Sequence, residues 1–377
     1  MHLRLVITAL CIAALAATDL APQARAATPK LGSYYVAIGD SFSYGYLTPS
    51  TPADPQCRAT TAPGFVCVFY RYLKRISPGV QLRNFSEPGA DSCVLVQGHR
   101  CYDPTPRASE LDAALAFIRA HPGGVSPITV TIGGNDLLSL VWAALSDPAG
   151  TARRLPGVLT NYRSNLDTIL SRLRGAAPDA QIIVTTQPNS LGGLGTPPLP
   201  PGFPALAKNA LGALNSVIKQ EAPKYRAVVA DSAAAFNANP GGAVALTYVP
   251  ISALSGDPFQ INIHPTAEGY AVYARAVIAA SGYTLPLMLS VRLAKAVVAP
   301  GSKNSVAGLT SPLASVRIRV DLPLGHHRTA LTRADGTGAF SRAFRVGRYA
   351  GTATVRVCAT DSAGQKVCKA KAQFAIR

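Results

Sequence analysis

Short apolar runs alternate with stretches of helical periodicity from about residue 34 to about residue 281. The apolar runs predict buried strands at 34–38, 80–85, 128–132, 182–186 and 227–230. Apolar residues three or four positions apart predict helices at 66–76, 108–120, 137–145, 158–173, 206–221 and 267–280. This alternation is typical of an α/β fold, in which helices cover both faces of a mostly parallel sheet.

The period changes to two residues after about residue 286. Apolar and polar residues alternate at 315–320 and 352–357, and Asp335-Gly336 is a turn signal between short strands. We therefore predict a smaller all-β sandwich of immunoglobulin-like type at 287–377, after an α/β catalytic domain at 27–286.

The first 26 residues have the form of a secretory signal peptide. Arg4 precedes an apolar run over 5–17, and Ala24-Arg25-Ala26 fits a cleavage site flanked by small residues. The alternative is a membrane anchor, but a helix needs about 20 apolar residues to cross a bilayer. We therefore expect a signal peptide at 1–26, cleavage near Ala26 and a secreted, extracellular protein.

The cysteines fit an exported protein. Of the seven, Cys11 lies in the leader, and the other six fall into local pairs. An even number in an exported chain indicates disulfides, and the CxxC spacing of zinc sites is absent. Sequence alone permits several pairings, and local clustering favours Cys57–Cys67, Cys93–Cys101 and Cys358–Cys368.

Positive charge is concentrated near the C-terminus. Lys and Arg outnumber Asp and Glu by 15 to 3 at 287–377, but only by 19 to 15 at 27–286. Such a field attracts anionic cell surfaces, wall polymers or lipid headgroups. No nucleic-acid recognition motif accompanies the charge, so we expect no specific nucleic-acid binding. A basic surface without a specific partner is the alternative.

One serine follows the first predicted strand where the strand ends. Gly39-Asp40-Ser41 comes directly after the apolar run, at the sheet edge where open α/β sheets bind ligands. If a helix begins at Phe42, the Ser41 amide points into the field of a helix N-terminus and can stabilise an oxyanion. A serine that only caps the helix is the alternative.

Three further motifs lie later in the chain. Gly89 comes after the second strand, Asn135 lies in a GGND sequence after the third, and His264 precedes the last helix. Glycine lets the backbone approach a ligand closely, and an asparagine amide can donate to developing negative charge. A neutral imidazole can activate a serine hydroxyl as a nucleophile.

In this order, these motifs resemble the sequence blocks of the GDSL, or SGNH, hydrolase family, most closely its exported actinobacterial members. The resemblance implies Ser41 as nucleophile and His264 as general base. It implies an oxyanion hole formed by the Ser41 and Gly89 amides and the Asn135 side chain. It also implies a flavodoxin-like sheet in the order 2-1-3-4-5, and no metal or organic cofactor.

The chain departs from the family pattern three residues before the histidine, where the family usually has aspartate and this chain has Ile261. Either a backbone carbonyl near Ile261 orients His264 in a Ser–His dyad, or Asp257 folds back from upstream. We favour the carbonyl because Pro258 stiffens the link from Asp257. An inactive relative is the third alternative.

The sequence therefore predicts a secreted carboxylic-ester hydrolase, a lipase or esterase, that forms an acyl-enzyme. Lipid acyl esters are favoured as substrates because apolar and aromatic residues lie near Ser41. One alternative is an acetylesterase that acts on polysaccharide. Another is a surface-binding protein with a vestigial hydrolase domain.

Overall fold

The computed structural model describes residues 29–144, 146–191, 202–252, 261–311, 314–335, 338–361 and 365–377. The predicted signal peptide and Asp257 lie outside these residues. Within the described ranges, every helix is too short or too polar to cross a membrane.

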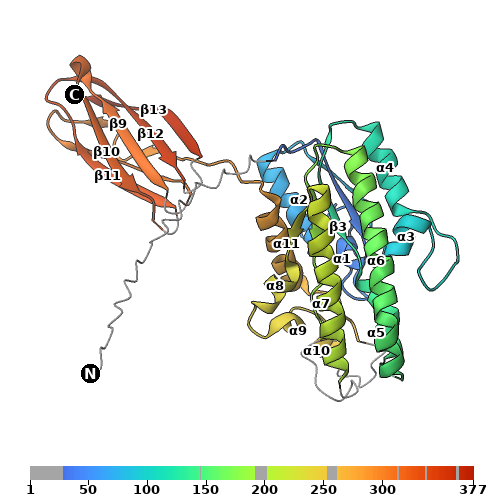
Figure 1. The fold of residues 1–377 in the computed structure, drawn as a ribbon. Helices are drawn as coiled ribbons and strands as arrows, with labels where there is room; N and C mark the ends of the chain where they lie inside the picture. The colour runs from blue at the N-terminus through green and yellow to red at the C-terminus, as the bar shows by residue number, and fades with distance from the viewer. Residues whose placement is uncertain are drawn as a thin grey trace, which may run out of the picture.

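A five-stranded parallel sheet forms the centre of the larger part of the chain (Figure 1). Its strand order is β2-β1-β3-β4-β5, with β1 at Tyr34–Gly39, β2 at Gln81–Asn84, β3 at Val125–Thr131, β4 at Ile182–Thr185 and β5 at Val228–Ala230. Every residue of β3 and β4 is buried, as expected for central strands covered on both faces. The α/β class and the order 2-1-3-4-5 are confirmed.

Two apolar clusters attach helices to opposite faces of this sheet. In β1, Val36 and Ile38 belong to one cluster, whereas Tyr35 and Ala37 belong to the other. This division follows from the two-residue period of a strand. The first cluster holds α3 (Ser92–Gln97), α4 (Glu110–Ala120), α5 (Gly134–Ala143), α6 (Pro148–Ala176) and α7 (Phe203–Glu221). The second holds α1 (Ser41–Tyr44), α2 (Phe65–Ile76), α8 (Ser232–Asn237), α9 (Gly242–Ala245) and α11 (Ala267–Ser281).

Several helices differ from the sequence prediction, and α6 and α3 show two of the reasons. Helix α6 begins at Pro148 rather than at residue 158, because Pro156 interrupts the periodic pattern without ending the helix. Helix α3 lies in a stretch for which no helix was predicted. It is six residues long, too short for a periodic signal, and the Asp91 side chain caps it by accepting from the Val94 amide.

Two further sheets follow residue 287. One has the strand order β10-β9-β12-β13-β7 and the other the order β11-β8-β6. Their strands are β6 (Arg292–Leu293), β7 (Val297–Val298), β8 (Lys303–Leu309), β9 (Ser315–Asp321), β10 (His327–Arg333), β11 (Ala339–Arg345), β12 (Gly351–Thr360) and β13 (Lys366–Ile376). The apolar cluster of this region begins at Leu287, whereas the clusters of the α/β region end at Tyr283. The predicted domain boundary, between residues 286 and 287, falls between these clusters. That boundary and the immunoglobulin-like type both stay predictions.

Candidate active site

Ser41 is the first residue of α1, directly after β1. The chain turns at Gly39, whose φ is 137° and where an added Cβ would lie 2.0 Å from the Thr131 carbonyl oxygen. Only glycine permits this close approach between β1 and β3. The Asp40 side chain then accepts a hydrogen bond from the Phe42 amide at 3.0 Å and starts the helix. Ser41 is thereby held at the carboxyl edge of the sheet.

The structure brings His264 to Ser41 although 223 residues separate them. The Ser41 Oγ and the His264 Nε2 lie 2.9 Å apart. His264 precedes α11, and its carbonyl accepts from the Tyr248 amide at 3.0 Å. The Tyr46 ring packs beside the imidazole, with centroids 4.5 Å apart. The backbone and the ring of His264 are therefore both held in place.

A residue that the sequence analysis missed contacts the other ring nitrogen. The Asn262 Oδ1 lies 2.7 Å from the His264 Nδ1 and also accepts from the His264 backbone amide at 3.0 Å. The Asn262 Nδ2 donates to the Leu47 carbonyl at 2.8 Å. These three contacts fix both the position and the orientation of the Asn262 amide.

These contacts also determine the tautomer of His264. A backbone N–H can only donate, so the Asn262 atom that faces it must be the oxygen. That same oxygen faces Nδ1, which must therefore carry the proton in the neutral ring. The Nε2 lone pair is then directed at Ser41, whose hydroxyl donates to it. This is the arrangement that a general base requires.

The group expected to orient His264 was a backbone carbonyl near Ile261, and the structure places the Asn262 side chain there instead. Ile261 is buried in an apolar cluster with residues that include Val249 and Leu191. The missed signal is local, because an asparagine side chain often accepts from the amide two residues later. Asn262 stands two positions before His264.

Burial lowers the pKa of His264 from its ordinary value of 6.5 to about 4. Desolvation disfavours the charged imidazolium, and the Asn262 amide that faces Nδ1 carries no negative charge to offset this. His264 is therefore neutral, and able to accept a proton, over most of the pH range.

The three predicted oxyanion donors lie on segments that meet at the same edge of the sheet. The Glu87 amide donates to the Gly39 carbonyl at 2.9 Å, and the Asn135 Nδ2 donates to the Ala90 carbonyl at 2.7 Å. Among the described residues, the Ser41 and Gly89 amides have no acceptor. One N–H of the Asn135 side chain likewise has no acceptor among the described residues. These donors are available to a ligand.

Two aspartates beside the motifs hold loops together. Asp136 accepts from the amide of Ser92, at 2.9 Å, and from its hydroxyl. Asp40 caps α1. Burial raises the pKa of Asp40 to about 7 and that of Asp136 to about 6. Both carboxyl groups form part of the framework beneath the serine.

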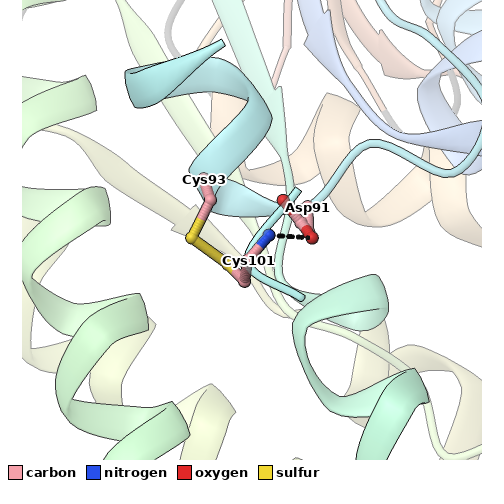
Figure 2. Close-up of side chains that lie close together, drawn as sticks. All are labelled: Asp91, Cys93 and Cys101. Carbon is pink, nitrogen blue, oxygen red and sulfur yellow. Dashed lines mark hydrogen bonds between the residues drawn. A yellow bond between two sulfur atoms is a disulfide. The ribbon is translucent and has the colours of Figure 1, made fainter. Parts of the chain in front are cut away.

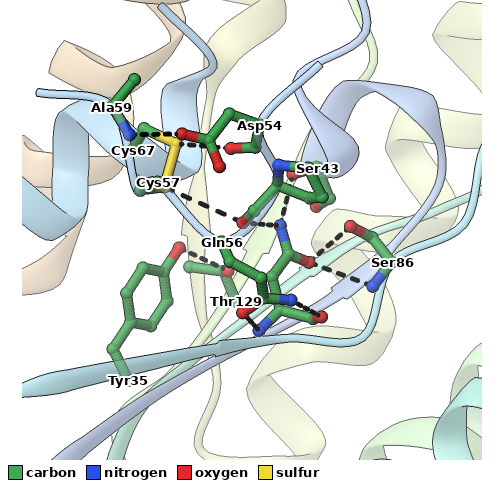
Figure 3. The surroundings of a disulfide bond; sticks show 11 residues. Tyr35, Ser43, Asp54, Gln56, Cys57, Ala59, Cys67, Ser86 and Thr129 are labelled. Carbon is green, nitrogen blue, oxygen red and sulfur yellow. Dashed lines mark hydrogen bonds between the residues drawn. A yellow bond between two sulfur atoms is a disulfide. The ribbon is translucent and has the colours of Figure 1, made fainter. Parts of the chain in front are cut away.

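The Cys57–Cys67 disulfide lies beside α1 (Figure 3). The Asn84 Nδ2 donates to the carbonyls of Ser43, in α1, and of Pro55, in the disulfide loop. This loop therefore supports the helix that begins with Ser41. The three disulfides in the structure are Cys57–Cys67, Cys93–Cys101 and Cys358–Cys368.

Asp91, Cys93 and Cys101 lie close enough to suggest a metal site (Figure 2). The two sulfurs are bonded to each other, so neither is a thiolate that could bind zinc. The Asp91 carboxylate instead accepts from the amides of Val94 and Cys101, each at 3.0 Å. This cluster is a structural brace.

The sequence profile of the GDSL-like lipase/acylhydrolase family matches residues 37–272, more than half of the chain. The chain belongs to this family. The resemblance predicted from the motifs is confirmed. As a member of the GDSL-like family, it is a hydrolase of the esterase and lipase type. The matched range contains Ser41, Gly89, Asn135 and His264.

Several solved structures of lipases and esterases are similar to this chain. A phospholipase A1 from Streptomyces albidoflavus is 22% identical, with a TM-score of 0.46, over 67% of this chain and 100% of its own. An extracellular lipase from Streptomyces rimosus is 20% identical, with a TM-score of 0.47, over 66% and 99%. A variant of an acetylxylan esterase from Geobacillus stearothermophilus is 18% identical, with a TM-score of 0.42, over 68% and 97%. No curated protein matches the sequence.

Proposed function

We propose that this protein is a secreted carboxylic-ester hydrolase in which Ser41 is the nucleophile and His264 the general base. The observation that carries the proposal is the contact chain from the Ser41 Oγ to the His264 Nε2, and from the His264 Nδ1 to the Asn262 Oδ1. A nucleophile, a base and a group that orients the base are the three parts of this chemistry.

In the proposed reaction, Nε2 of His264 takes the Ser41 proton as Oγ attacks the ester carbonyl carbon. The carbonyl oxygen becomes an oxyanion, stabilised by the Ser41 and Gly89 amides and the Asn135 side chain. The bond to the alcohol oxygen breaks, and that oxygen receives the proton from His264. Water then attacks the acyl-enzyme by the same steps, which releases the acid and restores Ser41.

In this mechanism Asn262, the residue that orients His264, is uncharged. Its carbonyl oxygen holds the imidazole in the correct tautomer, but it stabilises the transient imidazolium less than a carboxylate does. The low pKa of His264 agrees with this, because the group that contacts Nδ1 in the described part of the chain is a neutral amide. The inactive-relative alternative is disfavoured because serine, base and orienting group are all within hydrogen-bond distance.

Substitution of Ser41 tests the proposal. Ser41→Ala should abolish hydrolysis of p-nitrophenyl butyrate and leave the thermal unfolding transition in place. Ser43→Ala is the matched control, because Ser43 lies in the same helix and its hydroxyl faces the Ile38 carbonyl at 3.4 Å. Hydrolysis by Ser41→Ala at the rate of the control variant would refute the assignment.

Lipid acyl esters remain the favoured substrate class, with polysaccharide acetyl esters as the enzyme alternative. A series of p-nitrophenyl esters of increasing chain length separates them. Highest kcat/KM at acetyl indicates a deacetylase, and highest kcat/KM at longer chains indicates a lipase or esterase.

A basic sheet face supports a surface-binding role for the C-terminal region. Arg317, Arg319 and Arg356 are exposed on neighbouring strands, and Arg356 lies directly opposite Arg319. Replacing all three with Gln in the full chain should reduce cosedimentation with phosphatidylglycerol vesicles at low salt. Equal sedimentation of variant and parent protein would remove this role. An otherwise intact protein that binds but lacks esterase activity would favour the vestigial-hydrolase alternative.

A further inference from the structure

The side chain of Arg100 occupies the space beside Gly89, whose amide is a proposed oxyanion donor. Gly89 has a φ of 79°, and an added Cβ there would lie 2.7 Å from the Arg100 Nη2 and 3.6 Å from its Cζ. The guanidinium therefore packs directly on the Gly89 backbone. Any ester carbonyl that Gly89 binds lies next to this positive charge.

Most of the guanidinium donors of Arg100 are unused. Nη1 donates to the Tyr102 hydroxyl at 3.0 Å. Nε is buried without a partner, and Nη2 has no acceptor among the described residues. Nε and Nη2 form one edge of the planar group, the edge that suits two oxygens of a phosphate or carboxylate. Nε has almost no accessible surface, so Nη2 is the donor of this edge that a ligand can reach.

Arg100 is held in place by its neighbours. Cys101 is bonded to Cys93, and its amide donates to Asp91 at 3.0 Å (Figure 2). The His99 Nδ1 lies 2.9 Å from the Arg100 carbonyl. The backbone that carries the guanidinium is therefore fixed before a ligand arrives, which lowers the entropy lost on binding.

Arg107 provides a contrast within the same loop. Its Nη1 lies 3.7 Å from a carboxylate oxygen of Glu87, so its charge already has a partner. No described carboxylate lies within ion-pair distance of Arg100. The two arginines have equal charge, but only Arg100 has an unpaired edge beside the proposed site.

We propose that Arg100 binds an anionic phosphate of the ester substrate next to the scissile carbonyl, so that the preferred substrates are phosphate-bearing lipids. This inference rests on the proposed esterase function and names its substrate class. The phosphate accepts from the Arg100 Nη2 while the neighbouring carbonyl oxygen accepts from Gly89. Arg100 then determines specificity, whereas the bond-breaking steps remain with Ser41 and His264.

The test compares two substrates with the same acyl chain, dihexanoyl phosphatidylglycerol and the uncharged trihexanoin, both presented in the same detergent micelles. Arg100→Gln should lower the ratio of their kcat/KM values, phospholipid over triglyceride, by about tenfold, because a hydrogen bond to a charged group is lost. Arg107→Gln removes the same charge from the same loop and should leave the ratio within about twofold. Arg100→Lys keeps the charge without the planar edge and should give an intermediate ratio.

A second measurement uses the unmodified protein. sn-Glycerol 3-phosphate should inhibit trihexanoin hydrolysis competitively, whereas glycerol should not. Inorganic phosphate is run beside it: equal inhibition identifies a site for any phosphate, and stronger inhibition by glycerol phosphate identifies recognition of the lipid headgroup. If neither sn-glycerol 3-phosphate nor inorganic phosphate inhibits the reaction, the proposal is contradicted. This result does not depend on whether Arg100→Gln folds.

The outcomes separate this inference from the function on which it rests. If the parent protein hydrolyses neither ester, the esterase function itself fails. If it hydrolyses both and Arg100→Gln lowers both equally, or lowers neither, only the role of Arg100 is overturned. An equal loss in Arg107→Gln would also overturn it, because a general field effect would then explain the result.

Discussion

The Asn262 Oδ1 lies 2.7 Å from the His264 Nδ1, and the same oxygen accepts from the His264 backbone amide. This double contact places a proton on Nδ1 and directs the Nε2 lone pair at Ser41. A neutral side-chain amide thus orients the His264 ring, a role for which this family usually has a carboxylate.

Removal of the Asn262 side chain should therefore slow the reaction. Asn262→Ala leaves His264 free to rotate and to change tautomer, and kcat for p-nitrophenyl butyrate should fall about 100-fold. The control is Asn239→Ala, because Asn239 is partly exposed and its side chain donates to the carbonyl of the adjacent Pro240. An unchanged kcat in Asn262→Ala would show that another group orients the ring.

Asn262→Asp should raise the pKa of His264. A carboxylate beside Nδ1 favours the charged imidazolium, so the acidic limb of the kcat/KM profile should shift to higher pH. The same variant replaces the donor to the Leu47 carbonyl with an oxygen, so the free energy of unfolding should decrease. A profile that stays in place would contradict the assignment of His264 as the base.

The unmodified protein should retain activity in acid. Burial lowers the pKa of His264 to about 4, so the base remains unprotonated well below neutral pH. The kcat/KM of a non-ionising ester should fall to half near pH 4 as His264 gains a proton. A midpoint near the ordinary histidine value would show that the imidazole is more solvated than its contacts imply.

Glu110 should make the protein less stable as pH rises. Both of its carboxyl oxygens are buried, and burial raises its pKa to about 9. Between its unfolded value near 4.5 and about 9, the folded state binds the extra proton, so the free energy of unfolding decreases as pH increases. Glu110→Gln should flatten this dependence in denaturant titrations at several pH values. An equally steep dependence in the variant would assign the effect to other groups.

The sequence was sufficient to predict the parallel sheet and the meeting of Ser41 and His264 at its edge. Strands such as β4 are short apolar runs with clear ends, and the topology of a parallel sheet brings Ser41 to the edge where the loop before α11 returns. Helix α3 and the start of α6 escaped prediction because their caps, Asp91 and Asp147, lie outside any periodic pattern.

Asn262 escaped prediction for a different reason. The expected group was a backbone carbonyl or a carboxylate, whereas the group in the structure is a side-chain amide. A local pattern, asparagine followed two positions later by a residue with a free amide, would have identified it. No sequence pattern predicts that Nε and Nη2 of Arg100 are unpaired, because this depends on which acceptors lie near them in the folded chain.

The identity of the acylated residue is the most direct test of the central claim. The protein is mixed with a p-nitrophenyl ester, quenched in acid within the first turnover, and analysed by intact mass and peptide mass spectrometry. The account predicts one added acyl group, located on the peptide that contains Ser41 and absent from Ser41→Ala. An acyl group on another residue, or full turnover by Ser41→Ala, would contradict it.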